Sequence, residues 1–276
     1  MRFGMKEVAN VSELARLLII VFLAGYVPRR GDDLAGSLEG FLKPVAIVTA
    51  ACALLLAQPD MGSALTLAAV AAAMLLVAGT RLKYLASIGL LSLPFLYFMV
   101  MNVDYRRRRI LAFLNPWEDP SNSGFQIIQS WIAFGSGGAF GQGLGESKQK
   151  LFYLPEAHTD FIFSVIGEEF GLVGTLFVLL AFVTLFWRGL RAAFGAPDRF
   201  GFYLALGITT LLTLQALVNM GVCAGLLPTK GLTLPLMSYG GNSLIVACLV
   251  IGMLLRIDYE IRRDDPVNAE VQWARV

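Results

Sequence analysis

The chain has 276 residues, of which 57% are hydrophobic and only 15% are charged, and its formal net charge is +2. Soluble domains carry about 25% charged residues. Long, continuous apolar runs instead indicate an all-α, polytopic membrane protein, because a transmembrane β-barrel would show alternating polarity. The basic residues lie between the apolar runs rather than on one face, so nothing predicts nucleic-acid binding.

The cysteines predict neither a metal centre nor a disulfide framework. Cys52, Cys223 and Cys248 lie in or beside apolar segments, without C-x-x-C spacing or a Cys/His cluster. Small buried hydrophobic residues are the expected role. Residues 1–11 lack an apolar core followed by a cleavage site, so we expect no cleavable signal.

Seven apolar segments are predicted to span the membrane. They cover residues 12–27, 44–57, 63–78, 85–103, 161–187, 203–222 and 244–255. We expect one membrane domain over residues 1–276, with a long extracytoplasmic loop at residues 104–159 and a cytoplasmic tail at 258–276. Within the loop, residues 125–134 are weakly amphipathic and suit the membrane surface.

The distribution of basic residues predicts the orientation. Twelve Lys and Arg residues lie on the side of the C-terminus and nine on the other side, but six of those nine belong to the loop at 104–159. Long loops cross the membrane largely regardless of charge. The C-terminus is therefore expected in the cytoplasm, with the N-terminus and the long loop outside.

Carboxylates gather where the long loop enters the fifth apolar segment. Glu156, Asp160, Glu168 and Glu169 lie there with His158, the single histidine of the chain. A charge within a membrane helix costs roughly 2.5–3.5 kcal/mol at the centre and less near an interface, which favours a functional role. A solvated helix entrance is the alternative.

The same stretch is predicted to be helical from Asp160 onward. Asp160, Ser164 and Glu168 then share one face at i, i+4 and i+8. Gly167, Gly171 and Gly174 form a stripe of small residues that allows another helix to approach closely.

Four arginines, Arg106–Arg109, open the long loop on the predicted outer side. Guanidinium groups suit a phosphate or pyrophosphate head group. Pairing with Glu118 and Asp119, or with lipid phosphates in general, is an equally good interpretation.

Six separated motifs resemble the SEDS family of shape, elongation, division and sporulation proteins (the FtsW/RodA/SpoVE family). They are QPDMG (58–62), LAFLNPW (111–117), GSGG (135–138), QKLFYLPEAHTDFIF (149–163), LPTKG (227–231) and PLMSYGG (235–241). The resemblance covers about residues 12–256. The PTKG form is similar to the cell-division branch, since elongation relatives tend to have PVTG.

This resemblance implies an enzyme that polymerises lipid II into peptidoglycan glycan strands during septal cell-wall synthesis. The reaction takes place at the outer face of the bacterial cytoplasmic (inner) membrane and releases undecaprenyl pyrophosphate. The implied partners are a class b penicillin-binding protein transpeptidase, other divisome proteins and membrane lipids. Family members have about ten spans with both termini cytoplasmic, so we expect the first three spans to be missing here.

The resemblance also implies roles for single residues. Asp160 matches the family's essential aspartate, as general base or as ligand of a divalent cation such as Mg²⁺ or Mn²⁺; no cofactor is certain. Lys150, Glu156, His158 and Lys230 are expected to line the approach of the substrate. His158 and Lys230 have structural alternatives, as a hydrogen-bonding residue and as an interfacial lysine.

Further substrate contacts are expected at Arg109, Ser238, Glu13 and Arg16. Glu13 and Arg16 can pair at i, i+3. They match a family motif in which a proline stands at Val11 and a lysine at Arg16.

Two other functions stay open at this stage. One is a transporter that flips lipid II, which discontinuous helices around charges at mid-membrane would favour. The other is an inactive scaffold that holds a transpeptidase. The lack of charge over residues 172–186 favours chemistry at the membrane surface.

Overall fold

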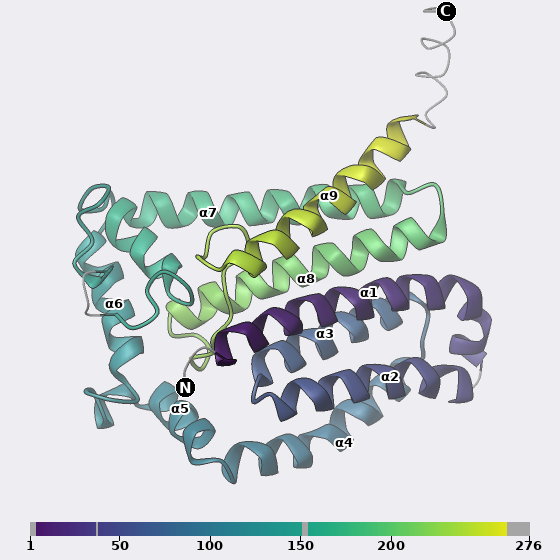
Figure 1. Ribbon diagram of the computed structural model, residues 1–276, viewed down its shortest axis with the longest axis horizontal. Helices are drawn as coiled ribbons and strands as arrows, with labels where there is room; N and C mark the ends of the chain where they lie inside the picture. The colour runs from purple at the N-terminus through teal and green to yellow at the C-terminus, as the bar shows by residue number, and fades with distance from the viewer. Residues whose placement is uncertain (1–3, 37, 151–153, 264–276) are drawn as a thin grey trace, which may run out of the picture. The chain divides into compact units, whose positions relative to one another are not determined.

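The computed structural model describes residues 4–36, 38–150 and 154–263. Over these residues the chain is built from helices (Figure 1). They are α1 (Gly4–Gly36), α2 (Leu38–Ala57), α3 (Met61–Val77), α4 (Leu82–Met101), α5 (Asp104–Leu114), the 3₁₀ helix η1 (Pro116–Glu118), α6 (Phe125–Gly137), α7 (Ile162–Gly195), α8 (Arg199–Cys223) and α9 (Gly241–Arg263).

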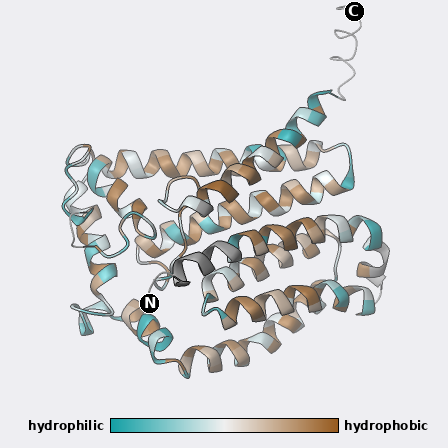
Figure 2. Ribbon diagram, viewed as in Figure 1, coloured by the Kyte–Doolittle hydropathy of each residue, from teal (hydrophilic) through white to brown (hydrophobic). Residues whose placement is uncertain are grey.

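Each of the seven predicted spans corresponds to one long helix, and the all-α fold class is confirmed. Among the described residues, α2, α4, α7 and α8 are long and apolar enough to cross a membrane. Helix α3 is apolar but has 17 residues. Figure 2 shows hydrophobic residues along these helices and hydrophilic residues where they join the connecting segments.

The chain forms two compact units, which we describe separately. The first comprises residues up to 85, 184–213 and those from 245 onward; the second comprises residues 86–183 and 214–244. Helices α7 and α8 contribute residues to both.

In the first unit, α1, α2 and α3 pack against one another (Figure 1). Leu55, Ala64 and Leu67 form a buried cluster there. The predicted turn at 58–62 is confirmed, and it also starts a helix: the Asp60 carboxylate accepts a hydrogen bond from Ser63 N at 3.0 Å. Such N-terminal caps satisfy backbone donors that a helix leaves without partners.

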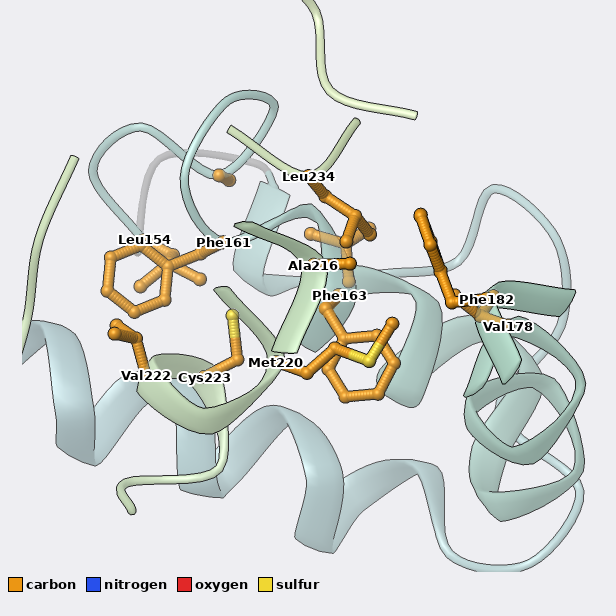
Figure 3. Close-up of a cluster of buried hydrophobic side chains, with 12 residues drawn as sticks. Leu154, Phe161, Phe163, Val178, Phe182, Ala216, Met220, Val222, Cys223 and Leu234 are labelled. Carbon is orange, nitrogen blue, oxygen red and sulfur yellow. The ribbon is translucent and has the colours of Figure 1, made fainter. Parts of the chain in front are cut away.

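The second unit holds the candidate site. Its core is a cluster of apolar side chains from the start of α7, the end of α8 and the segments around them (Figure 3). Leu154 and Phe161 belong to this cluster and are 4% and 2% exposed. They lie on either side of Asp160 in sequence, so the core anchors the turn that carries Asp160.

Part of the region that we expected to be a long loop is helical. Helices α5 and α6 and the 3₁₀ helix η1 fall within residues 104–159. The amphipathic segment at 125–134 lies in α6, where Ile127 and Ala133 are buried while Trp131 and Ile132 are exposed. Contact of α6 with the membrane surface stays a prediction.

Candidate active site

Asp160 lies in a turn just before α7, not on the helix itself. The carbonyl oxygen of Glu156 accepts hydrogen bonds from the backbone N–H groups of Thr159, Asp160 and Phe161 at 3.0–3.3 Å. Helix α7 begins only at Ile162, so the prediction of a helix from Asp160 onward was two residues too early. Ser164 and Glu168, which follow on the helix, are buried.

The segment after α8 closes over this turn. Tyr239 N donates to the carbonyl of His158 at 2.9 Å, and Ser238 Oγ donates to the carbonyl of Thr159 at 2.6 Å. Gly231 lies so near the Asp160 carboxylate that a Cβ there would be 3.1 Å from Oδ2. Two motifs far apart in the sequence therefore meet at Asp160.

The surroundings of Asp160 favour its neutral form. Burial and, to a smaller extent, the Glu156 carboxylate raise the pKa of Asp160, and the Arg109 guanidinium lowers it; together they give a raised pKa of about 6. Desolvation and a like charge both disfavour a carboxylate. A carboxyl group with a pKa near the working pH is suited to general-base chemistry.

Arg109 is placed by α5 to face the same site. Its Nη1 donates to the carbonyl of Thr229 at 3.0 Å, and its guanidinium carbon lies 4.4 Å from the centre of the Tyr105 ring. The bond to Thr229 holds the cation beside the segment that carries Lys230, whose side chain is partly buried. Arg109 thus places positive charge near Asp160, and such charge suits a phosphate group.

The other predicted contacts are more structural than expected. The Ser238 hydroxyl, besides its bond to Thr159, accepts a hydrogen bond from Leu234 N at 2.7 Å. The Glu156 carboxylate accepts one from Thr159 Oγ1 at 3.0 Å. Direct substrate contacts by Ser238, Glu156 and the exposed side chain of His158 stay predictions.

Glu168 and Glu169 are not a solvated helix entrance. The Glu168 carboxylate, 1% exposed, accepts hydrogen bonds from Ser147 Oγ at 2.5 Å and from the backbone N–H groups of Lys148 and Gln149 at 3.2 Å. Glu169 pairs with Lys150, with Oε1 and Nζ 2.6 Å apart. The two carboxylates hold residues 147–150 against α7. Lys150 as a direct substrate contact stays a prediction.

The predicted stripe of small residues coincides with a break in α7. Gly171 has a φ of 64° and a ψ of −156°, which interrupts the helix. The carbonyls of Glu168 and Glu169 accept from Gln142 N and Gly143 N, and Leu172 N donates to Gly138 O at 2.9 Å. The glycine-rich segment 138–143 thus satisfies the backbone groups that the break releases.

Close approach at this stripe is confirmed for Gly167. A Cβ on Gly167 would collide with the Phe134 ring of α6, and one on Gly137 would collide with the Gly167 carbonyl. At Gly174 the crowding comes from Phe170 of the same helix.

Glu13 and Arg16 belong to the first unit. Arg16 is 2% exposed, and its Nη2 lies 3.6 Å from Glu13 Oε1, so the predicted i, i+3 pair is present. A role of this pair in substrate binding stays a prediction.

Two polar residues of α8 at this site were not predicted from the sequence. Asn219 and Gln215, which are 1% and 6% exposed, hydrogen-bond to the segments on both sides of the site. They lie four residues apart within an apolar span, which places them on one helix face. That spacing of amides in an apolar segment was the signal that could have identified them.

A divalent cation has limited protein ligands at this site. Among the described residues there is no group of three or more His, Cys, Asp or Glu side chains that could hold a metal ion. Mg²⁺ commonly uses one or two carboxylates together with substrate phosphates. Asp160 and Glu156 fit that pattern, and a cation ligated by Asp160 stays a prediction.

Comparison with known proteins assigns the chain to a family. The model of the FtsW, RodA and SpoVE family, described as cell cycle protein, matches residues 9–263. The probable peptidoglycan glycosyltransferase FtsW of Geobacter metallireducens is 56% identical over 251 residues, which are 91% of this chain and 67% of that protein. The protein of the same name from Legionella pneumophila is 50% identical over 92% of this chain and 65% of its own length.

Solved structures agree with this relationship. A structure described as showing the coordination of polymerization and crosslinking by a peptidoglycan synthase complex matches 96% of this chain and 84% of its own, with 26% identity and a TM-score of 0.67. A mutant of the rod shape determining protein RodA from Thermus thermophilus matches 92% of this chain and 67% of its own, with 28% identity and a TM-score of 0.58. The chain spans about two thirds of the length of its curated relatives, and it belongs to the FtsW/RodA/SpoVE family of polytopic membrane proteins.

Proposed function

We propose that this chain carries the active site of a peptidoglycan glycosyltransferase that polymerises lipid II. The observation that carries the proposal is the environment of Asp160: a carboxyl group with a pKa of about 6, with Arg109 and the segment of Lys230 beside it. The names of the relatives, which are peptidoglycan glycosyltransferases, support it.

In the proposed reaction Asp160 is the general base. The 4-hydroxyl of one lipid II sugar gives its proton to the Asp160 carboxylate, and its oxygen forms a bond to the anomeric carbon of the lipid-linked chain. The bond between that carbon and the pyrophosphate oxygen breaks, and undecaprenyl pyrophosphate leaves with the electron pair. Arg109 and Lys230 stabilise the negative charge on the leaving group.

The accompanying features follow from the same proposal. The site would face the outer side of the cytoplasmic membrane, the chain would act in septal synthesis, and a class b penicillin-binding protein would crosslink the glycan. The match to a peptidoglycan synthase complex supports such a partner. A cation bound by Asp160 and the substrate pyrophosphate would lower the charge repulsion between them; loss of activity with a chelator tests this role.

Transport of lipid II is the second candidate, and the break in α7 is the observation that favours it. Transporters often bind substrate at discontinuous helices with charges nearby. Here, however, the backbone groups released at Gly171 are bonded to segment 138–143, and the carboxylates of Glu168 and Glu169 are bonded to residues 147–150. The break therefore has a structural explanation, and we favour the enzyme.

The test is polymerisation of labelled lipid II by the purified chain with its transpeptidase partner, wild type against Asp160→Asn. Glycan ladders from the wild type and none from the variant are expected. Equal ladders from both would exclude Asp160 as the base. Lipid II flipping in liposomes without any ladder would support transport, and neither activity would support an inactive scaffold.

A further inference from the structure

We propose that Asn219 is a positioning residue that fixes Asp160 relative to the segment at 229–233, and that polymerisation depends on the hydrogen bond from its side-chain amide to Asp160. This inference rests on the proposed function. It assigns to the end of α8 a role in the reaction that neither the motifs nor the resemblance indicated.

The Asn219 amide joins the two segments of the site directly. Its Nδ2 donates to the carbonyl of Asp160 at 2.8 Å and to the carbonyl of Leu232 at 2.6 Å. An amide nitrogen carries two hydrogens, so both bonds form at once. The side chain is 1% exposed, which leaves water no access to replace either bond.

The backbone around Asp160 depends on such bonds. The carbonyls of His158, Thr159 and Asp160 each accept a hydrogen bond, from Tyr239 N, Ser238 Oγ and Asn219 Nδ2 respectively. Asn219 is the donor that also holds the 229–233 segment. Its removal would leave the Asp160 carbonyl with the weak Cys223 Sγ donor at 3.6 Å and would take from the Leu232 carbonyl the hydrogen bond of the Asn219 amide.

Among the residues that the structure describes, the hydrogen bonds at Asp160 are made by its backbone. Within the described part of the chain, no donor lies within hydrogen-bonding distance of its oxygens. Its place beside Gly231, where a Cβ would be 3.1 Å from Oδ2, therefore follows from where the main chain is fixed. A misplacement of about 1 Å in a reacting group can lower a rate about 100-fold.

Gln215 offers a matched control on the same face of α8. Its Nε2 donates to the carbonyl of Thr233 at 3.0 Å and to Thr233 Oγ1 at 3.2 Å, and its side chain is 6% exposed. It holds the second segment without bonding to Asp160. Asn219→Leu and Gln215→Met therefore each remove a buried side-chain amide from the same face of α8. Of the two, Asn219→Leu removes the hydrogen bond to the Asp160 carbonyl.

The experiment measures two properties of the full chain with its transpeptidase partner. The first is amide hydrogen exchange over residues 154–161 and 229–234; the second is kcat and KM for polymerisation of labelled lipid II. For Asn219→Leu we expect faster exchange in both segments and a kcat about 100-fold lower, with KM within about threefold of wild type. For Gln215→Met we expect faster exchange at 229–234 alone and a kcat within about fivefold.

Three outcomes would overturn the inference. Unchanged exchange at 154–161 in Asn219→Leu would show that the amide does not hold Asp160. Faster exchange in Asn219→Leu together with a wild-type kcat would show that the hydrogen bonds of Asn219 stabilise the fold without affecting the reaction. A loss of kcat in Gln215→Met equal to that in Asn219→Leu would show a general loss of packing. A wild-type chain that makes no glycan would instead refute the proposed function, so the two failures are distinguishable.

Discussion

The ion pair between Lys150 and Glu169 gives a test of whether Lys150 contacts substrate or holds the fold. The pair is short, with 2.6 Å between Nζ and Oε1, and the side chains are 23% and 9% exposed. Lys150→Met leaves Glu169 with a nearly buried charge. The family resemblance favours a substrate contact at Lys150, whereas the geometry favours the structural role.

The loss of folding stability in Lys150→Met follows from the burial of the Lys150–Glu169 ion pair. A hydrogen bond between charged groups contributes about 1.5–3 kcal/mol. Since Lys150 is partly exposed, solvent screening reduces the loss in Lys150→Met to about 1–2 kcal/mol. At about 2–4 °C per kcal/mol, the unfolding midpoint should fall by about 2–8 °C. The exposed side chain of Lys148, in the same segment, provides the control: Lys148→Met should change the midpoint by less than about 1 °C.

The double variant Lys150→Met/Glu169→Gln separates the two interpretations. It removes both charges, so the midpoint should return most of the way to wild type, because no uncompensated buried charge is left. If Lys150 acts only through Glu169, glycan synthesis should return with the midpoint. A double variant that regains stability but remains inactive would refute the structural reading and identify Lys150 as a substrate contact.

The other predictions concern Asp160 and two glycines. With a raised pKa of about 6, Asp160 must lose its proton before it can act, so activity should fall below about pH 6; Arg109→Gln, which removes a charge that lowers this pKa, should move the fall to higher pH. Because the pKa of Asp160 is higher in the folded chain than in the unfolded chain, ionisation of Asp160 opposes folding. Protonated Asp160 contributes stability that is fully present below about pH 4 and is lost as the pH rises through about 6. Asp160→Asn should therefore raise the unfolding midpoint at pH 8 and leave it unchanged at pH 4, and equal shifts at both values would contradict this. Gly231→Ala should lower kcat with little change in the midpoint, because its Cβ would crowd Asp160 Oδ2. Gly171→Ala should destabilise the chain by at least about 1–3 kcal/mol in denaturant unfolding, since φ at that residue is +64°.

The helices were predictable because they depend on local pattern. The seven apolar runs correspond to helices at the predicted places, and four of the described helices are long and apolar enough to cross a membrane. The proximity of Asp160 to the PTKG segment followed from a different source, the family motifs. Composition and periodicity carry no information on which loops meet in space.

What the sequence did not predict depends on contacts between distant segments. Glu168 and Glu169 have the same chemistry as Asp160, and only the fold of residues 147–150 around them gives them structural roles. The break at Gly171 likewise requires segment 138–143 as its partner. Asn219 lies in an apolar span whose sequence predicts either a lipid-facing or a buried position. Its two acceptors are backbone carbonyls, and since every residue has one, no sequence pattern identifies them.

These contacts explain how one segment keeps carboxylates with opposite tasks. Glu168 accepts hydrogen bonds from three donors, which occupy most of the lone-pair sites of its carboxylate. A general base needs the reverse, since the lone pair that takes the substrate's proton must not already be bonded. The proposed site meets this requirement because Asn219 and Ser238 fix the main chain at Asp160 and Thr159 and not the Asp160 carboxylate. Positioning through the backbone therefore gives Asp160 a defined place and a raised pKa together, which direct hydrogen bonds to its oxygens would prevent.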